Sequence, residues 1–355
     1  MPIFTGADLR EDRRIQCDLC VVGSGAGGSV VAQRASAAGL AVVVLEEGGF
    51  HTSDSFDMTE ANMNRLLYQE AGARRTADGA IQIVQGRSVG GSTVVNWTTC
   101  FRTPEHTFEH WAERFGVEGL SHAALVPHWE QLERQLNVQQ AKLAEVNRNN
   151  MVTWRGAGAL GWHQGLLYRN IKRCAHTGYC GMGCPIDAKQ SMLVTMIPEA
   201  VRAGADVYAN AWVDKLAGDG GKVRGVVARM RDPETDQPNG VTLEVEARTT
   251  VLAGGGINSP ALLLRSGLNR KGLVGQRTFL HPAVGSFGIH EEAIEPYTGA
   301  PQYVYSDQFA RRDAGMGFLL EGAPLFPMGL GGFVHSFGAD KRAMMGQLKN
   351  MSLTA

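Results

Sequence analysis

The segment 18–49 constrains the fold of this chain more than any other part of the sequence. It begins with an apolar run at 19–22, passes through a glycine-rich turn into a stretch of small residues, and ends with a second apolar run at 40–45 that leads to Glu46. The glycines of the turn are Gly23, Gly25 and Gly28. This order predicts a strand, a tight turn, a helix that ends near Ala38, and a second strand followed by an acid.

The residue types in this segment suit a ligand that carries phosphate. Glycines let the backbone approach a pyrophosphate without Cβ atoms in the way, and the N–H groups at the start of the helix stabilise its negative charge. The acid at Glu46 is placed to bond a ribose hydroxyl, and it would repel the 2′-phosphate of NADP. The segment therefore predicts binding of an adenine dinucleotide, and it leaves FAD and NAD both open.

The composition excludes several classes of function. A net charge of −1 over 355 residues gives no electrostatic reason to expect nucleic-acid binding or attraction to an anionic membrane. No apolar run approaches the roughly 18 residues of a membrane helix, and the N-terminal residues lack the apolar core of a secretion signal. We therefore expect a cytoplasmic protein of roughly two domains with no membrane span.

The rest of the chain predicts a mixed α/β fold, α+β overall. Helices are expected at 58–71, 122–136 and, more loosely, 141–154, where Gly156 and Gly158 break the helical pattern. A cysteine-bearing loop at 174–184 follows, and another helix is expected after it. Strands are then expected from Asp206 to Gly256.

A β-meander is expected after residue 206. Its predicted strands, separated by turn residues, lie at 212–216, 223–230 and 243–247. A separate central strand is expected to begin at Thr249 and to end in glycines. A parallel sheet with such a meander is more typical of an FAD-binding domain than of a plain NAD-binding domain.

Three motifs resemble those of the glucose–methanol–choline (GMC) flavin oxidoreductases. They are GSGAGG at 23–28 with Glu46, GRSVGGSTVVNW at 86–97, and GGGINSPALLLRSGL at 254–268. The resemblance implies a Rossmann-like FAD-binding domain with a β-meander, plus an incomplete substrate-binding domain.

The resemblance also implies where these domains lie. The FAD-binding domain is expected to be discontinuous, at 15–110 and 192–285, around a helical insertion with the cysteine loop at 111–191. The start of a truncated substrate-binding domain is expected at 286–355.

Residues that match the family's motifs are expected to bind FAD. In the family, the pyrophosphate lies on the first glycine turn, the adenosine ribose meets the acid, and the second motif runs beside the pyrophosphate and the flavin ring. The expected cofactor-binding residues are Gly23, Ser24, Gly25, Gly28, Glu46, Arg87, Gly90, Gly91, Ser92, Asn96 and Val213.

What the resemblance implies about function is the oxidation of CH–OH groups in an alcohol or polyol. A flavin accepts hydride from the carbon while a base removes the hydroxyl proton. The family's base is a histidine in a late block that is absent from these 355 residues. No catalytic residue is therefore assigned, and the chain is expected to be a fragment without that block. Its partners would be a small-molecule alcohol and an electron-acceptor protein.

Three cysteines suggest a second cofactor. Cys174, Cys180 and Cys184 have the spacing C-x5-C-x3-C, with glycines between them and Pro185 after the third. Cysteine thiolates in such loops hold iron–sulfur clusters, and some sugar and polyol dehydrogenases of the resembled family carry one. Long-chain alcohol oxidases of the family have a similar loop with no established cluster, so structural thiols are the alternative.

Two other functions remain open at this point. One is a non-catalytic FAD-binding fragment, which the missing late block favours for this chain. The other is a nicotinamide-dependent dehydrogenase, which the second glycine motif and the meander disfavour.

Overall fold

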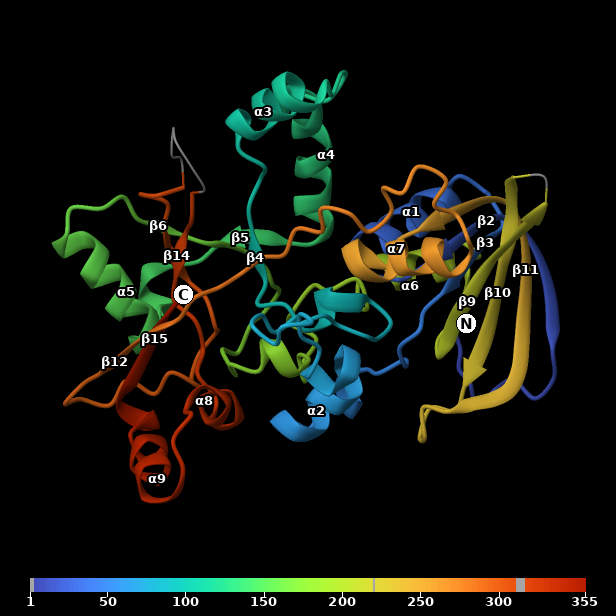
Figure 1. Ribbon diagram of the computed structural model, residues 1–355. Coiled ribbons are helices and arrows are strands. Elements are labelled where there is room, and N and C mark those ends of the chain that lie inside the picture. Colours follow the sequence, from blue (N-terminus) through green and yellow to red (C-terminus); the bar gives the residue numbers. More distant parts are fainter. Residues whose placement is uncertain (1–2, 220, 311–316) are drawn as a thin grey trace. The chain divides into compact units, whose positions relative to one another are not determined.

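The computed structural model describes residues 3–219, 221–310 and 317–355 (Figure 1). These residues form two compact units, each built from several parts of the chain. The first unit contains the described residues of Met1–Asn96, Gly181–Asp187 and Ser191–Pro282, and the second those of Trp97–Cys180, Ala188–Gln190 and Ala283–Ala355. The domain boundaries that the family resemblance implies remain a prediction.

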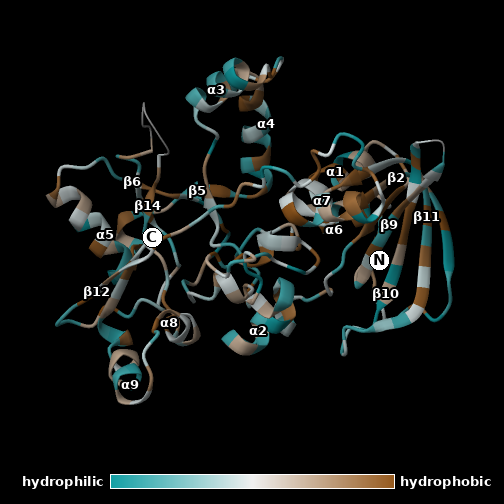
Figure 2. Cartoon of the chain, in the orientation of Figure 1, coloured by the Kyte–Doolittle hydropathy of each residue, from teal (hydrophilic) through white to brown (hydrophobic). Residues whose placement is uncertain are grey.

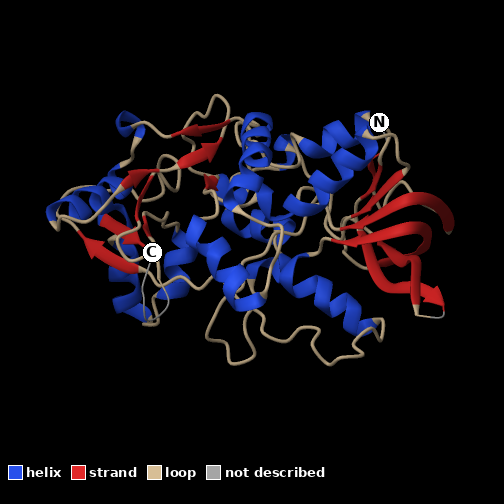
Figure 3. Cartoon of the chain, turned by 90° about the horizontal axis from the view of Figure 1, so that it is seen from above, coloured by secondary structure: helices blue, strands red, loops and turns tan. Residues whose placement is uncertain are grey.

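The first unit is built on one seven-stranded sheet with the strand order β1-β8-β3-β2-β11-β10-β9. The first five strands of this order run parallel, and β10 and β9 continue the sheet as an antiparallel meander whose twist is visible in Figure 3. The strands are β1 Ile3–Phe4, β2 Arg13–Val22, β3 Val42–Leu45, β8 Asp206–Tyr208, β9 Ala211–Asp219, β10 Lys222–Arg231 and β11 Pro238–Leu252. The mixed α/β fold with an added meander, expected from the sequence, is confirmed.

Strand β11 corrects one expectation. The sequence separates a third meander strand at 243–247 from a central strand that begins at Thr249, but the structure has one continuous strand over 15 residues. Its residues Leu243–Leu252 pair in parallel with β2, while its earlier part also pairs with β10. Arg248, the single residue between the two predicted strands, is exposed on the sheet and does not interrupt it.

The burial of the strands explains their composition. Val21 and Val44 in the parallel part are fully buried, as expected for strands covered on both faces. Along β10 and β11, buried apolar residues alternate with exposed polar ones (Figure 2). The parallel part of the sheet is therefore buried on both faces, whereas the meander is buried on one face and exposed on the other.

The described part of this unit has four helices: α1 Ala26–Ala37, α2 Glu60–Leu67, α6 Met196–Arg202 and α7 Gly255–Arg265. Helix α1 packs against α6, and α7 packs against β9. Gly39 and Gly204 follow α1 and α6 with φ angles of +83° and +100°, as left-handed helix ends require.

Helix α2, Glu60–Leu67, is shorter than the expected 58–71. A 3-10 turn at Gln69–Gly72 follows, in which Glu70 and Ala71 have φ angles of +52° and +54°. Helix α2 itself ends at its C-cap, Tyr68, whose backbone is extended with φ −120° and ψ +148°, and the sequence pattern did not reveal this end. The unit also has 3-10 turns at Ser53–Ser55 and Gly91–Val94.

The described residues of the second unit form three small sheets and five helices. Its sheets have the orders β12-β15, β14-β13-β6 and β4-β7-β5. The strands are β4 Thr99–Cys100, β5 Val138–Gln140, β6 Gly165–Leu166, β7 Tyr168–Asn170, β12 Ser286–Ile289, β13 Val304–Ser306, β14 Leu320–Glu321 and β15 Met351–Thr354. The helices are α3 Glu105–Phe115, α4 His122–Gln135, α5 Arg148–Ala159, α8 Pro327–Phe333 and α9 Gly338–Gly346, with 3-10 turns at Leu143–Glu145 and Leu348–Asn350. A further 3-10 turn, Cys180–Met182, has its first residue in the second unit and the other two in the first.

Helix α5 corrects a second expectation. It begins at Arg148, where the side chain of Asn147 accepts a hydrogen bond from the N–H of Asn150, and it continues through Gly156 and Gly158. The helix therefore starts later than the expected 141, and its glycines do not end it. Across the described parts of the chain, no helix is both long and apolar enough to cross a membrane.

Candidate functional site: two glycine turns beside a buried carboxylate

The first glycine turn connects β2 to α1 within the first unit. Gly23 has φ +103°, and a Cβ placed there would come within 2.6 Å of the carbonyl oxygen of Ala253. A Cβ at Gly28 would lie 1.9 Å from the carbonyl oxygen of Gly23. These two glycines are therefore needed for the fold of the turn itself.

Gly25 differs from Gly23 and Gly28. No atom lies within 4 Å of the position that its Cβ would occupy. It is the N-cap of α1, it makes no side-chain cap hydrogen bond, and the first turn of the helix contains no acidic residue. The start of α1 thus offers open space beside backbone N–H groups, the arrangement that favours a bound phosphate.

Glu46 follows β3 directly and is only 7% exposed. One carboxylate oxygen, Oε2, accepts hydrogen bonds from the N–H and the hydroxyl of Ser24 at 2.9 and 2.7 Å. The other, Oε1, accepts one from the N–H of Gly48 at 2.9 Å. Burial raises the pKa of Glu46, and the bonds from Ser24 and Gly48 oppose that rise.

The second glycine turn lies directly on the first. The N–H of Gly90 donates to the hydroxyl of Ser24 at 2.9 Å. Gly91 has φ +56°, and a Cβ there would lie 2.7 Å from the Cα of Gly25. The structure therefore brings together two glycine motifs that the sequence placed in the same site, and it shows that Gly91 permits their contact.

The remaining predicted cofactor residues occupy different positions in the first unit. Ser92 is exposed and accepts a hydrogen bond from the N–H of Gly86 at 2.9 Å, and Asn96 is exposed after the same 3-10 turn. Val213 is buried in the core on β9, where its carbonyl oxygen accepts a hydrogen bond from Arg265 at 3.0 Å.

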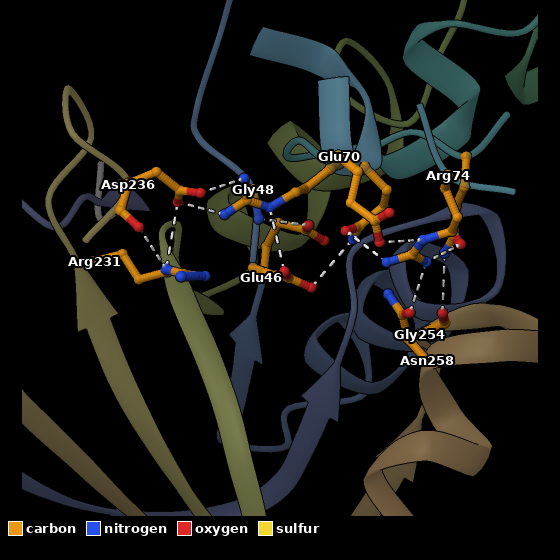
Figure 4. A network of polar contacts seen from close by, with 12 residues as sticks. Glu46, Gly48, Glu70, Arg74, Arg231, Asp236, Gly254 and Asn258 are labelled. Atoms are coloured by element: carbon orange, nitrogen blue, oxygen red, sulfur yellow. Dashed lines mark hydrogen bonds and ion pairs between the residues drawn. The ribbon is translucent and has the colours of Figure 1, made fainter. Parts of the chain in front are cut away.

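A network of charged and amide side chains extends from Asp236 to Asn258 within the first unit (Figure 4). The guanidinium of Arg87 donates to both carboxylate oxygens of Asp236, at 2.9 and 2.5 Å, and its Nε lies 3.3 Å from Glu47. The network continues through Gln69, Arg74, Gln85, Asn258 and the carbonyl of Gly254. Arg87 is one of the residues expected from the second glycine motif, whereas its partners come from separate segments that share no motif, so the sequence did not indicate them.

The cysteine loop does not form the expected metal site. Among residues 3–219, 221–310 and 317–355, no group of three or more His, Cys, Asp or Glu side chains is arranged to hold a metal ion. Within the second unit, Cys174 Sγ accepts a hydrogen bond from the N–H of His176 at 3.4 Å, and Lys189 Nζ donates to the carbonyl of Cys180 at 2.6 Å. The iron–sulfur prediction for Cys174, Cys180 and Cys184 is therefore not supported.

A parallel sheet with a glycine turn after one strand and a buried acid after the next defines the class of dinucleotide-binding α/β domains. The chain belongs to the GMC oxidoreductase family, whose model matches residues 64–283. The GMC enzymes are FAD-dependent oxidoreductases, so the predicted family and cofactor class are confirmed.

Curated relatives agree with this assignment. An uncharacterized GMC-type oxidoreductase of Mycobacterium tuberculosis (strain ATCC 25618 / H37Rv) is 35% identical over 328 residues, which is 92% of this chain and 50% of that protein. Long-chain-alcohol oxidase FAO4B of Arabidopsis thaliana is 30% identical over 292 residues, covering 81% of this chain and 39% of the oxidase. The chain thus spans about half the length, or less, of these relatives.

Solved structures share the fold. Pyridoxine 4-oxidase from Mesorbium loti matches with a TM-score of 0.60 at 20% identity, over 86% of this chain and 66% of that one. A variant of formate oxidase from Aspergillus oryzae RIB40 matches with a TM-score of 0.66 at 16% identity, over 98% of this chain and 73% of that one.

Proposed function

We propose that the first unit binds FAD at the two glycine turns. In this arrangement the pyrophosphate lies at the start of α1 beside Gly25, and Glu46 holds a ribose hydroxyl. The open space at Gly25, the N-cap of α1, is the observation that carries the proposal, because Gly23 and Gly28 on either side of it are backed by protein atoms. The chemistry of the donor set agrees, since α1 presents N–H groups with no acid in its first turn.

Glu46 has the capacity for this role. Among the described residues, its Oε1 accepts one hydrogen bond, from Gly48, and a carboxylate oxygen can accept two. The bonds from Ser24 fix the carboxylate at the end of β3, so a ribose hydroxyl would meet a group that is already oriented. Ser92 and Asn96, both exposed, are proposed to contribute further polar contacts, and Arg87, Gly90, Gly91 and Val213 to line the site.

The reaction we propose for the intact protein is oxidation of a CH–OH group in an alcohol or polyol. Bound flavin supplies the hydride acceptor, and the protein binds and orients the alcohol and excludes water. Two similar proteins, named long-chain-alcohol oxidase and pyridoxine 4-oxidase, support an alcohol as the substrate class. A small-molecule substrate and an electron-acceptor protein are the proposed partners, in the cytoplasm.

The test is flavin retention after replacement of Glu46. Glu46→Ala should weaken FAD binding by about 1–3 kcal/mol, the scale of a lost charged hydrogen bond. Glu118→Ala, at an exposed position outside the first unit, is the control and should leave retention unchanged. Equal flavin content in both variants would contradict the placement of Glu46 at the ribose.

A further inference from the structure

The pair Arg87–Asp236 joins the second glycine turn to a distant part of the same unit. Arg87 opens the motif that reaches Gly90 and Gly91, while Asp236 lies in the connection between β10 and β11. The two hydrogen bonds between them are parallel and charge-assisted, which is the strong form of an arginine–carboxylate pair. The side chain of Arg87 is only 16% exposed, so this contact is shielded on the arginine side.

The connection that carries Asp236 is itself ordered. Oδ1 of Asp232 accepts hydrogen bonds from the N–H groups of Glu234 and Thr235, at 3.0 and 2.8 Å. Arg231 donates to the carbonyl oxygen of Asp236 at 3.1 Å. The carboxylate of Asp236 is thus presented to Arg87 by a turn that is fixed independently of Arg87.

On the other side, Arg87 lies against the residues that follow Glu46. A Cβ at Gly48 would come within 2.3 Å of the carbonyl carbon of Arg87 and the nitrogen of Ser88. The N–H of Val89 donates to the carbonyl of Gly49 at 3.0 Å. The backbone at 87–89 therefore runs directly along the segment that carries the acid, with no space for adjustment.

A shift of Arg87 would reach the cofactor site through the backbone. Three residues further on, the N–H of Gly90 bonds Ser24, and Gly91 touches Gly25, the glycine with open space in front of it. Since Gly91 has no room for even a Cβ against Gly25, a displacement of the second turn toward the first would change the shape of the first turn.

We propose that Asp236 is a positioning residue for FAD: by clamping Arg87, it sets the second glycine turn against the first and so controls how tightly the cofactor is held. This inference rests on the proposed FAD site. Asp236 does not touch the site itself, and no motif of the sequence marks it.

The charge of Arg87 agrees with this role. Burial acts to lower the pKa of Arg87, but the hydrogen bonds to Asp236 and the charges of Glu47, Asp236 and Glu46 raise it overall. Its guanidinium is therefore permanently charged, and its acidic partners stabilise that charge in a largely buried position. Asp236 is 48% exposed, so solvent weakens the pair and the expected effect is moderate.

The experiment measures the Kd for FAD of apoprotein reloaded with the cofactor, together with the thermal midpoint of the apoprotein. Asp236→Asn keeps the size of the side chain and removes its charge. It should raise the Kd about tenfold while the apoprotein midpoint changes little, because the turn at 232–235 is held by its own hydrogen bonds. Asp236→Glu, which keeps a carboxylate, should recover most of the affinity.

Asp219→Asn is the matched control. Asp219 pairs with Arg224 on the same meander, at 2.8 Å, and both side chains are exposed. Among the described residues, no hydrogen bond joins either of them to the glycine turns at 23–28 and 86–91. The Kd of the Asp219→Asn variant for FAD should equal that of the wild type. A Kd for Asp236→Asn within twofold of wild type would overturn the positioning role. A marked fall in the thermal midpoint of the apoprotein alongside the weaker FAD binding would also overturn it, because the variant would then be destabilised as a whole. A wild-type protein that binds no FAD would instead overturn the proposed function, and this inference with it.

Discussion

The hydroxyl of Ser24 lies between Glu46 and Gly90, donating to the carboxylate at 2.7 Å and accepting from the backbone N–H at 2.9 Å. Ser24 is fully buried, so water cannot replace either bond. One side chain thus joins the acid after β3 to the second glycine turn.

Ser24→Ala should lower the free energy of unfolding by about 1–2 kcal/mol, because it leaves the N–H of Gly90 buried without its acceptor. Chemical denaturation of the apoprotein measures this loss. Ser55→Ala, at an exposed position in the same unit, should cost almost nothing. Equal midpoints for the two variants would show that the hydroxyl does not join the two segments.

Gly91→Ala should destabilise the protein by at least about 2 kcal/mol, since the added Cβ would lie 2.7 Å from Gly25 Cα and φ is +56°. Gly156→Ala is the matched comparison. It lies inside α5 with no atom within 4 Å of the added Cβ, so it should stabilise the protein by roughly 0.5–1 kcal/mol. Thermal unfolding of both variants checks the opposite signs, and a shift of the same sign in both would contradict this geometry.

The raised pKa of Glu46 predicts a pH dependence of apoprotein stability. The folded state keeps the proton of Glu46 to a higher pH than the unfolded state, in which the pKa of this carboxyl has its ordinary value of 4.5. Below pH 4.5 both states are protonated, and stability then falls as the pH rises from 4.5 to the folded-state pKa. Glu46→Gln should remove this part of the profile. Denaturation curves across that range, compared between the two proteins, measure it, and parallel profiles would refute the raised pKa.

Cys17 should react slowly with iodoacetamide. Burial, together with the neighbouring charge of Asp18, raises the pKa of its thiol from 9.0 to about 11. At pH 8 the thiolate fraction is therefore about a hundredfold lower than for an unperturbed thiol. Peptide mapping by mass spectrometry separates this cysteine from the others, and urea-unfolded protein provides the reference rate. A native rate within a few-fold of the unfolded one would contradict the prediction.

The parts of the fold that the sequence predicted are those determined by local pattern. The turn at 23–28, helix α1 and strand β3 follow from glycine spacing and apolar runs, and the structure has them close to the expected positions. Helix α5 differs from the expected helix at 141–154 because long-range contacts stabilise it through its glycines. Asn149, within this helix, donates to the carbonyl oxygen of Ala323 at 2.8 Å, and such contacts outweigh the low helix propensity of its glycines.

The candidate site divides in the same way. The sequence brought Glu46 and the two glycine turns together through known motifs, but it gave no sign of Asp236. That residue meets Arg87 only because β10 and β11 are connected by a turn of a particular shape, which is a property of the folded sheet. Pairing between charges so far apart in the chain cannot be recognised without an alignment or a structure.

The backing of the first glycine turn by Ala253 has a consequence for biosynthesis. The carbonyl of Ala253 supports Gly23, its Cβ lies 3.0 Å from the Cβ position of Gly28, and β11, which leads to it, pairs with β2. Residues 23–28 leave the ribosome early, whereas Ala253 follows after most of the first unit has been translated, roughly ten seconds or more later. A nascent chain therefore cannot complete this turn when it first emerges, and loading of a dinucleotide must wait until β11 has been added to the sheet.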